Sequence, residues 1–384
     1  MISCGEASGD LYAGALASEL RRRDPSCHVV GLGGDRLRDA GADLAGEYGR
    51  LAVTGLTEAI RVLPRSYGMY RRLVAHARAE RPDVFVAVDF PDFNFKVAAS
   101  MQRLGIPVVY YVGPQLWAWR PGRIHAMARF VTKVLVIFPF EVEIYERAGI
   151  PVEFVGHPLI DLVQVTASRE RFLSDLGLSA GSPTLALLPG SRINELHAIG
   201  STLISALPLI AACVPRLQVV VARAPHLPSD LFRQMESVNV PLAVVEGRTD
   251  DVLHAADAVV TASGTATIQT ALHGRPMVIV YRVSPLTYRL GRRFVRVNTF
   301  GMANLVAGRP VVPELIQDDF SVDRVAAEAV RLLTDTSVAA RMREDLAAVR
   351  AKLGTPGATG RAAKAVLDIV RERPTHATAL QGTS

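Results

Sequence analysis

The stretch that decides the fold is Leu185-Ala186-Leu187-Leu188-Pro189-Gly190-Ser191-Arg192-Ile193-Asn194-Glu195, near the middle of a chain of 384 residues. A short apolar run ends at Pro-Gly, and a helical pattern begins after Ser191 and Arg192. This order of strand, turn and helix points backbone N–H groups and a helix N-terminus at an anion. The guanidinium of Arg192 adds a forked cation suited to phosphate oxygens. For an isolated Gly-Ser-Arg, an ordinary turn with a solvated arginine is the better explanation. Whether this turn binds an anion therefore depends on the motifs found in the rest of the chain.

Length and composition indicate a globular protein of two domains. The chain is too long for one comfortable core, and it is 49% hydrophobic and 21% charged. No apolar run reaches the roughly 18 residues of a membrane span, and no secretory signal precedes the first helix, so we expect a cytoplasmic protein. Cys4, Cys27 and Cys213 are scattered without metal-binding spacing, and we expect no metal.

The formal net charge is +6, and the basic excess is mostly arginine. Because nothing resembles a nucleic-acid module, phosphorylated substrates or an anionic membrane surface are the expected partners. The segments 60–65 and 67–78 are basic and amphipathic. A core-packed helix with a solvated arginine face explains them, and a lipid-binding surface becomes the better interpretation only if a lipid substrate is established.

Two series of strands and helices are predicted, before and after a polar linker that follows Gly156-His157-Pro158. The strands are continuous apolar runs, as in parallel sheets covered by helices on both faces. The fold class is therefore α/β, with two doubly wound Rossmann-like domains facing each other across a cleft. The expected strands are 1–4, 28–32, 83–89, 107–112, 132–138 and 152–155, then 184–188, 217–222, 242–245, 258–262 and 277–281. The expected helices include 11–23, 65–80, 92–104, 141–148, 324–352 and 361–373, and the predicted parts are 1–165, 166–345, C-terminal helices at 346–375 and a tail at 376–384.

Two nucleotide signatures are excluded. Gly31 to Arg36 lacks the third glycine of the dinucleotide fingerprint and does not follow the first strand. Gly190-Ser191-Arg192 has neither the spacing nor the lysine of a Walker loop.

Several polar loops follow strands of the first series, where open α/β sheets bind ligands. Gly5 to Asp10 is expected as a loop after the first strand. Asp89-Phe90-Pro91-Asp92-Phe93-Asn94 contains a candidate general base, although Asp92 or Asn94 can equally cap a helix. The pair of carboxylates favours function, because a cap needs only one.

The stretch from Tyr110 to Arg120 carries both tryptophans, Trp117 and Trp119, near Gln115 and Arg120. Such aromatics suit a wall that stacks on a sugar or holds an acyl chain. Packing in the domain's own core is an equally good explanation.

In the second series, Ser263-Gly264-Thr265 follows a strand and opens a helix that carries Gln269. A glycine there lets a ligand approach the backbone, and the hydroxyls can donate to phosphate or ribose. Together with the Pro-Gly-Ser-Arg loop, this turn indicates the two ends of one nucleotide diphosphate. In the loop from Asn304 to Gln317, polar residues interrupt apolar ones, and secondary-structure propensity does not explain this composition.

Taken together and in order, these motifs resemble the lipid-A-disaccharide synthase family of GT-B glycosyltransferases. The set comprises Gly5–Asp10, Pro91–Asn94, Pro114–Arg120, Pro139–Glu141, Gly156–Pro158, Leu187–Arg192, Ala262–Ala266 and Asn304–Arg309. Each is weak alone, but the ordered set is highly specific.

The resemblance implies an inverting reaction that needs no cofactor and no bound metal. UDP-2,3-diacylglucosamine gives its sugar to the 6-hydroxyl of 2,3-diacylglucosamine 1-phosphate, which yields lipid A disaccharide 1-phosphate and UDP. It also implies a cytoplasmic enzyme at the inner face of the inner membrane. C-terminal helices that cross back to the first domain, and a homodimer with exchanged C-terminal segments, are further expectations from the family.

Residue roles follow from the same resemblance. Asp92 is the expected general base, the loop with Glu6, Ser8 and Asp10 faces the reacting centre, and Arg192 neutralises the diphosphate. The expected UDP-binding residues are Ser191, Arg192, Glu195, Ser263, Gly264, Thr265, Gln269 and Asn304. The expected acceptor- and lipid-binding residues are Asn94, Gln115, Trp117, Trp119 and Arg120. Many relatives have glutamate at position 269, where GT-B enzymes bind ribose, so in this chain the neutral amide of Gln269 is expected to make that contact.

Two alternatives stay open. The first is another UDP-sugar enzyme of GT-B fold, such as an epimerase or a peptidoglycan glycosyltransferase. The second is a nucleotide-binding protein of the membrane surface without turnover.

Overall fold

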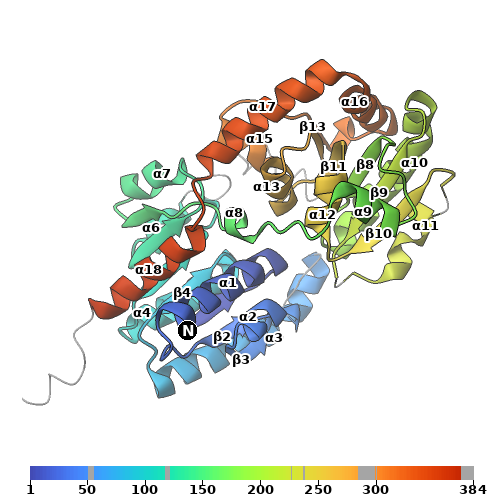
Figure 1. Cartoon of the computed structure of the whole chain (residues 1–384). Helices are drawn as coiled ribbons and strands as arrows, with labels where there is room; N and C mark the ends of the chain where they lie inside the picture. Colours follow the sequence, from blue (N-terminus) through green and yellow to red (C-terminus); the bar gives the residue numbers. More distant parts are fainter. Residues whose placement is uncertain are drawn as a thin grey trace, which may run out of the picture. The chain divides into compact units, whose positions relative to one another are not determined.

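The computed structural model describes residues 1–50, 56–116, 122–225, 227–236, 238–283, 299 and 301–372 (Figure 1). The chain forms two compact units, unit 1 from Met1–Asp161 with the segment from Gly354 onward, and unit 2 from Leu162–Leu353. The chain thus enters unit 2 before the predicted boundary at 165 and leaves it after the one at 345. The predicted tail at 376–384 lies outside the described residues.

Unit 1 contains a parallel sheet of seven strands in the order β3-β2-β1-β4-β5-β6-β7. The central strands are buried throughout, which explains why they read as continuous apolar runs. β3 is partly exposed and polar, and the sequence did not predict it. The strands are β1 (Ile2–Cys4), β2 (Val30–Gly33), β3 (Asp43–Glu47), β4 (Phe85–Val88), β5 (Val108–Tyr111), β6 (Lys133–Val136) and β7 (Val152–Phe154).

The helices of unit 1 come from both ends of the chain. They are α1 (Ala7–Arg23), α2 (Asp35–Asp39), α3 (Leu56–Glu80), α4 (Pro91–Arg103), α6 (Arg123–Met127), α7 (Glu141–Arg147), α8 (Leu159–Leu162) and α18 (Ala358–Arg371), with a 3₁₀ turn at Tyr48–Arg50. α18 packs along α1, beside it in Figure 1. The carboxylate of Asp161 fixes the start of α18, accepting hydrogen bonds from the backbone N–H of Gly357 (2.6 Å) and Thr359 (2.9 Å).

The Gly156-His157-Pro158 motif lies inside unit 1. The His157 ring is buried, with Tyr12 edge-on at 5.9 Å and Phe138 at 5.4 Å between ring centroids. Its Nδ1 accepts a hydrogen bond from the backbone N–H of Leu159 (3.2 Å). Burial lowers the pKa of His157 to about 3, so this histidine is neutral in the folded protein.

Unit 2 contains a parallel sheet of six strands in the order β10-β9-β8-β11-β12-β13. The strands are β8 (Thr184–Leu188), β9 (Gln218–Arg223), β10 (Leu242–Glu246), β11 (Ala258–Ala262), β12 (Met277–Tyr281) and β13 (Glu314–Ile316). The helices are α9 (Arg169–Asp175), α10 (Ile193–Cys213), α11 (Arg233–Glu236), α12 (Thr249–Ala255), α13 (Thr265–Leu272), α15 (Met302–Ala307), α16 (Val322–Thr334) and α17 (Thr336–Lys352), with 3₁₀ turns at Ser229–Phe232 and Gln317–Asp319.

The helix predicted over 324–352 is in fact two helices, α16 and α17. They meet at Asp335, whose carboxylate accepts hydrogen bonds from the backbone N–H groups of Ser337 (3.0 Å) and Val338 (3.1 Å). Asp335 is thus the N-cap of α17 and begins a second helix, whereas the apolar pattern is continuous here and predicts a single helix.

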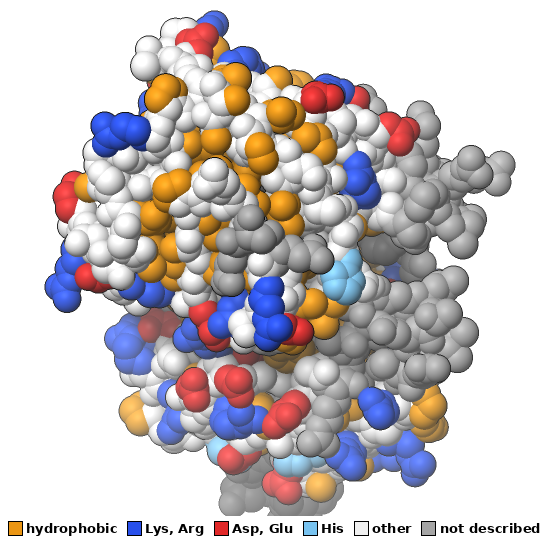
Figure 2. Space-filling model, turned by 90° about the vertical axis from the view of Figure 1, so that its right-hand side faces the viewer, with side chains coloured by type: hydrophobic (Ala, Val, Ile, Leu, Met, Phe, Trp, Pro, Cys, Tyr) orange, Lys and Arg blue, Asp and Glu red, His pale blue; other side chains and the backbone are white. Residues whose placement is uncertain are grey.

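By length and composition alone, helix α10 could cross a membrane, although it contains no continuous apolar run of that length. Its buried residues recur every three or four positions, from Leu196 to Ile210, and it packs against α16 and β12. Leu209, outside this stripe, is exposed. Figure 2, which turns the side of unit 2 that carries α10 toward the viewer, shows hydrophobic side chains gathered on that side of the molecule. The buried stripe is that of a helix covering one face of a sheet.

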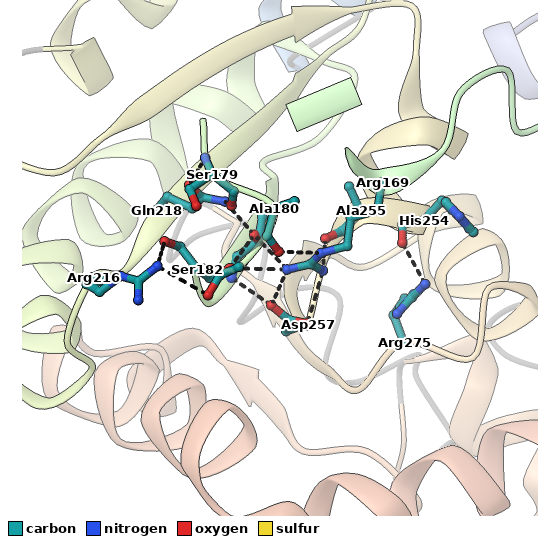
Figure 3. A network of polar contacts seen from close by, with 12 residues as sticks. Arg169, Ser179, Ala180, Ser182, Arg216, Gln218, His254, Ala255, Asp257 and Arg275 are labelled. Carbon is teal, nitrogen blue, oxygen red and sulfur yellow. Dashed lines mark hydrogen bonds and ion pairs between the residues drawn. The ribbon is translucent and has the colours of Figure 1, made fainter. Parts of the chain in front are cut away.

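The amino edge of the sheet of unit 2 is held by a polar network around Arg169 (Figure 3). The guanidinium donates to both carboxylate oxygens of Asp257, at 3.0 and 2.9 Å, and to the hydroxyl of Thr184 at 3.2 Å. It also donates to the backbone carbonyls of Ala180, Ser182 and Ala255. Asp257 in turn accepts the backbone N–H of Thr184 (2.8 Å), so one cation joins α9 to the starts of β8 and β11.

Candidate functional site

The carboxyl edge of the sheet in unit 1 contains strained backbone. Asp89 (φ 46°) and Phe90 (φ 52°) follow β4, and Val112 (φ 59°) follows the neighbouring strand β5. A left-handed conformation costs a residue with a side chain about 1–2 kcal/mol, and such strain clusters at functional sites. Gly5, after β1, makes room for this turn, because a Cβ there would lie 2.1 Å from the Phe90 ring.

Asp92 lies in the first turn of α4, directly after the strained turn. The N-cap of α4 is Phe90, so Asp92, two residues further along, is not the N-cap residue. Its side chain is 71% exposed, with Oδ1 2.7 Å from Nη1 of Arg123. The positive end of the helix dipole and the Arg123 guanidinium therefore both meet this carboxylate. An exposed carboxylate at the ligand-binding edge of the sheet can accept a proton from a hydroxyl.

Asn94 was predicted to contact the acceptor, but in the structure its side chain is buried and bonded within the protein. It is fully buried, and its Nδ2 donates to the carbonyls of Ser3 (3.1 Å) and Asp89 (2.8 Å). Its Oδ1 accepts the hydroxyl hydrogen of Ser3 at 2.6 Å. The amide therefore ties β1 to the turn after β4, and it supports Asp92 by fixing the turn.

The predicted loop from Gly5 to Asp10 is mostly helix, since α1 begins at Ala7 with Glu6 as its N-cap. Asp10 is buried (3% exposed), and its carboxylate accepts the backbone N–H groups of Gly34 (2.6 Å), Arg36 (3.0 Å) and Leu37 (3.2 Å). Asp10 therefore holds the start of α2 and does not face a reacting centre. Glu6 is exposed and Ser8 half-buried, so these two of the predicted group lie at the surface of the carboxyl edge.

Gln115 is exposed after β5. Trp117, Trp119 and Arg120, the remaining residues predicted to bind the acceptor, lie outside the described residues.

In unit 2, the turn from β8 to α10 has the predicted strand–turn–helix form. Gly190 (φ 112°) makes the turn, and a Cβ there would lie 2.4 Å from Oε2 of Glu195. That carboxylate oxygen accepts the backbone N–H of Ser191 (3.0 Å) and of Arg192 (3.3 Å). Glu195 thus occupies two of the amides predicted to bind an anion, and its role is to hold the loop. The side chain of Arg192 is 45% exposed, with Nη1 3.4 Å from Glu195 Oε1.

The second turn of unit 2 runs from β11 into α13. β11 pairs with β8, with Thr261 opposite Leu188, so the two turns leave neighbouring strands at the same level of one edge. Gly264 has φ 148°, a conformation open essentially to glycine alone, and, among the residues that the structure describes, a Cβ there would meet no atom within 4 Å other than those of its chain neighbours. Gly264, between the half-buried Ser263 and Thr265, therefore borders open space at the edge where the Arg192 loop also lies.

Asn304 was predicted to bind the nucleotide, but its side chain is buried and bonded within the protein. It is 2% exposed, and its Oδ1 accepts the backbone N–H groups of Val311 (2.7 Å) and Val312 (2.9 Å). Its Nδ2 donates to the Val312 carbonyl (2.9 Å) and to Oε1 of Glu314 (2.6 Å). The amide closes the loop between α15 and β13, which explains the polar composition of that stretch.

Gln269 lies on α13, and its Nε2 donates to Oδ1 of Asp250 at 2.8 Å. Neither Asp250 nor Arg123, the partner of Asp92, was singled out from the sequence, because each lies far along the chain from its partner. Within the described ranges, no three His, Cys, Asp or Glu side chains are grouped so that they could hold a metal ion.

Comparison with known proteins gives a family and a fold. A family model for lipid-A-disaccharide synthetase matches residues 1–369. The lipid-A-disaccharide synthase of Geobacter sulfurreducens is 42% identical over 374 residues, covering 96% of this chain and 97% of the relative. That of Myxococcus xanthus is 40% identical over 371 residues, with coverages of 96% and 97%.

The similar solved structures are far more distant in sequence. A UDP-GlcNAc 2-epimerase from Neisseria meningitidis bound to UDP-GlcNAc has a TM-score of 0.67 at 11% identity, covering 96% of this chain and 99% of that one. MurG of Acinetobacter baumannii has a TM-score of 0.57 at 14% identity, with coverages of 96% and 98%. At such identities the likeness shows the fold alone, a pair of Rossmann-like domains of the GT-B class.

Proposed function

The chain belongs to the lipid-A-disaccharide synthase family, and from this premise we propose which of its residues carry each part of the reaction. The enzyme is a glycosyltransferase that joins UDP-2,3-diacylglucosamine to 2,3-diacylglucosamine 1-phosphate and releases UDP. The reaction inverts the anomeric carbon, so the base and the leaving diphosphate act on opposite faces of the sugar.

In this proposal Asp92 is the general base. The observation that carries it is the exposed Asp92 carboxylate, placed by a strained turn at the N-terminus of α4 and contacted by Arg123. It accepts the proton of the acceptor 6-hydroxyl as that oxygen attacks the anomeric carbon. Glu6 and Ser8, at the same edge of unit 1, contact the reacting sugars, and Gln115 contacts the acceptor.

Unit 2 binds the UDP moiety. The Arg192 guanidinium and the Ser191 hydroxyl contact the diphosphate, and the open turn at Gly264 lets the nucleotide approach the backbone, flanked by the Ser263 and Thr265 hydroxyls. Cationic groups fixed where the leaving-group charge develops stabilise the transition state.

A release assay for UDP tests the function. Purified protein should release UDP only when both acylated substrates are present, and the product should be the β-1,6 disaccharide. Unacylated UDP-N-acetylglucosamine is the matched control, because an epimerase or a peptidoglycan glycosyltransferase would use it. UDP binding without product from any acceptor would instead identify a non-catalytic nucleotide-binding protein.

Membrane association is a second part of the proposal, because both substrates are lipids. In the described part of α3, Met69, Leu73 and Ala77 pack in the core of unit 1, whereas Arg71 and Arg72 are exposed. We assign this arginine face to the anionic surface of the inner membrane, on its cytoplasmic side.

Co-sedimentation with vesicles that contain anionic lipid tests the arginine face. The variant Arg71→Glu/Arg72→Glu should sediment less than wild type. Arg341→Glu/Arg343→Glu on α17 of unit 2 changes the net charge equally and should sediment as wild type does. Equal sedimentation of all three proteins would refute the assignment.

A further inference from the structure

Gln269, expected from the sequence to bind UDP, lies in a cluster of three polar side chains in unit 2, and the other two, Asp250 and His273, have no role in the reaction described so far. Oδ1 of Asp250, at the start of α12, accepts hydrogen bonds from Nε2 of Gln269 and Nε2 of His273, each at 2.8 Å. Oδ2 accepts the backbone N–H of Gln164 at 3.0 Å. The side chains of Asp250 and His273 are 17% and 5% exposed.

The cluster continues toward the proposed nucleotide site along one face of α13. Thr265, Gln269 and His273 are four residues apart, so they form a stripe on this helix. His273 and Gln269 are anchored on Asp250, and Thr265 opens the helix beside the unobstructed turn at Gly264. Gln269 is thus the middle member, between the anchor and the edge of the sheet.

The chemistry of the anchor fixes which way the Gln269 amide faces. Burial opposes the charge on Asp250, but hydrogen bonds from His273, the Gln164 backbone and Gln269 outweigh it and lower the pKa of this carboxyl. A charged carboxylate only accepts hydrogen bonds, so Gln269 must turn its NH₂ group toward Asp250. The carbonyl Oε1 of the planar amide then faces away from the carboxylate.

We propose that Asp250 is a positioning residue that makes Gln269 an acceptor for the ribose hydroxyls of UDP. The inference rests on the proposed nucleotide site and deepens it. A free glutamine presents either a donor or an acceptor, whereas this anchored amide presents its carbonyl only. Gln269 therefore offers hydroxyl donors what a glutamate would offer, without a charge near the diphosphate.

The adjacent Asp251 supplies a matched control. Its carboxylate accepts the backbone N–H and the hydroxyl hydrogen of Thr166, at 2.7 and 2.6 Å, and Nε–H of Arg248 at 2.8 Å. Asp250 and Asp251 thus both hold the segment 164–167 to α12, but only Asp250 contacts Gln269. A loss caused by loosening this segment would appear in both variants.

The test compares the affinity for UDP with that for 2′,3′-dideoxy-UDP, both measured by calorimetry. Wild type should favour UDP. Asp250→Asn should weaken UDP by about 2- to 12-fold, the worth of one neutral hydrogen bond, and leave dideoxy-UDP unchanged. Asp251→Asn, and the milder Thr166→Val, should keep the wild-type ratio. The double variant Asp250→Asn/Gln269→Glu should restore the ratio, because the new asparagine donates to the new carboxylate.

Three results would overturn the inference. They are an unchanged ratio in Asp250→Asn, an equal loss in Asp251→Asn, and a wild type that binds both nucleotides equally. Failure of the proposed function looks different, since the wild type would then not bind UDP at all, or would release none with both acylated substrates present.

Discussion

The turns that carry the proposed catalytic and nucleotide-binding residues are built differently in the two units. In unit 1, residues with side chains adopt the strained conformations, namely Asp89, Phe90 and Val112. In unit 2, the turns after β8 and β11 are made by glycines, Gly190 and Gly264, with open space beside Gly264. Gln317 (φ 54°), after β13, is the residue with a side chain that adopts the left-handed conformation at this edge among those described. A turn made by side-chain residues fixes a reactive group such as the Asp92 carboxylate, whereas a turn made by glycine exposes backbone and lets a ligand approach. The difference agrees with the proposal that unit 1 supplies the base and unit 2 binds the nucleotide.

The largest expected effect is on turnover in unit 1. Asp92→Asn keeps the shape of the side chain but removes the proton acceptor, so turnover should fall by about 100- to 10,000-fold while UDP affinity stays at the wild-type value. Steady-state rates and calorimetry measure the two quantities. Lys96→Ala, an exposed change on the same helix, is the control. Near-normal rates in Asp92→Asn would assign the base elsewhere.

The amino edge of unit 2 should carry stability without function. Arg169→Ala removes the cation that satisfies Asp257 and three backbone carbonyls, and should cost about 3 kcal/mol of the free energy of unfolding of unit 2. Hydrogen exchange in peptides of unit 2 measures this loss. UDP affinity of the folded protein should not change. Arg171→Ala, an exposed arginine on the same helix, should have little effect on either.

At the carboxyl edge of unit 2 the expectation is reversed. Arg192→Ala should weaken UDP binding by about 1.5–3 kcal/mol, which is the usual worth of a hydrogen bond to a charged group, with little change in unfolding. Arg192→Lys should recover only part of the affinity, because an ammonium lacks the planar fork. UDP affinity at the wild-type value in Arg192→Ala would contradict the assignment of the diphosphate site.

The glycine turns allow a smaller test. Gly264→Ala forces a side chain into a conformation that costs about 1–3 kcal/mol, and should lower both stability and UDP affinity. Gly274→Ala also meets open space at positive φ (61°), but in the turn that leads into the amino end of β12. It should lower the melting temperature only. A loss of UDP affinity in both variants would mean that the loss reflects general destabilisation.

The smallest effect concerns pH and unit 1. His157 has a folded pKa of about 3 and an unfolded pKa near 6.5, so below pH 6.5 the unfolded chain gains a proton that the folded chain does not. Protonation of the unfolded chain therefore does not lower the free energy of unfolding above pH 6.5. As the pH falls from 6.5 toward 3, the free energy of unfolding decreases by up to about 1.4 kcal/mol per pH unit. Urea unfolding at pH 7.5, 6.5 and 5.5 measures the slope, and His157→Asn should flatten it.

The sequence predicted the elements that bury both faces and missed those that depend on distant partners. The predicted bounds of β8, β11 and β12 match the structure, because each is a continuous buried run. β3 begins and ends with a charged residue, and β13 is three residues long and begins with Glu314, so no continuous apolar run marks them.

The site divides in the same way. The turns that carry Asp92, Arg192 and Gly264 were predicted from local order alone, since strand, turn and helix follow one another in the chain. Asn94 and Asn304 were assigned to ligands, yet each is saturated by groups of the protein itself. A buried amide and a ligand-binding amide look alike in a motif, because backbone carbonyls from other elements leave no trace in the sequence.

The return of α18 to unit 1 has a consequence for how the protein is made. A ribosome synthesises residues 162–353 after the first part of unit 1 and before α18, so unit 2 is whole before its predecessor is. Until α18 emerges, the face of α1 that it covers has no partner, and Asp161 lacks the two backbone donors of Gly357 and Thr359. The nascent chain therefore carries a complete unit 2 while unit 1 still lacks its last helix.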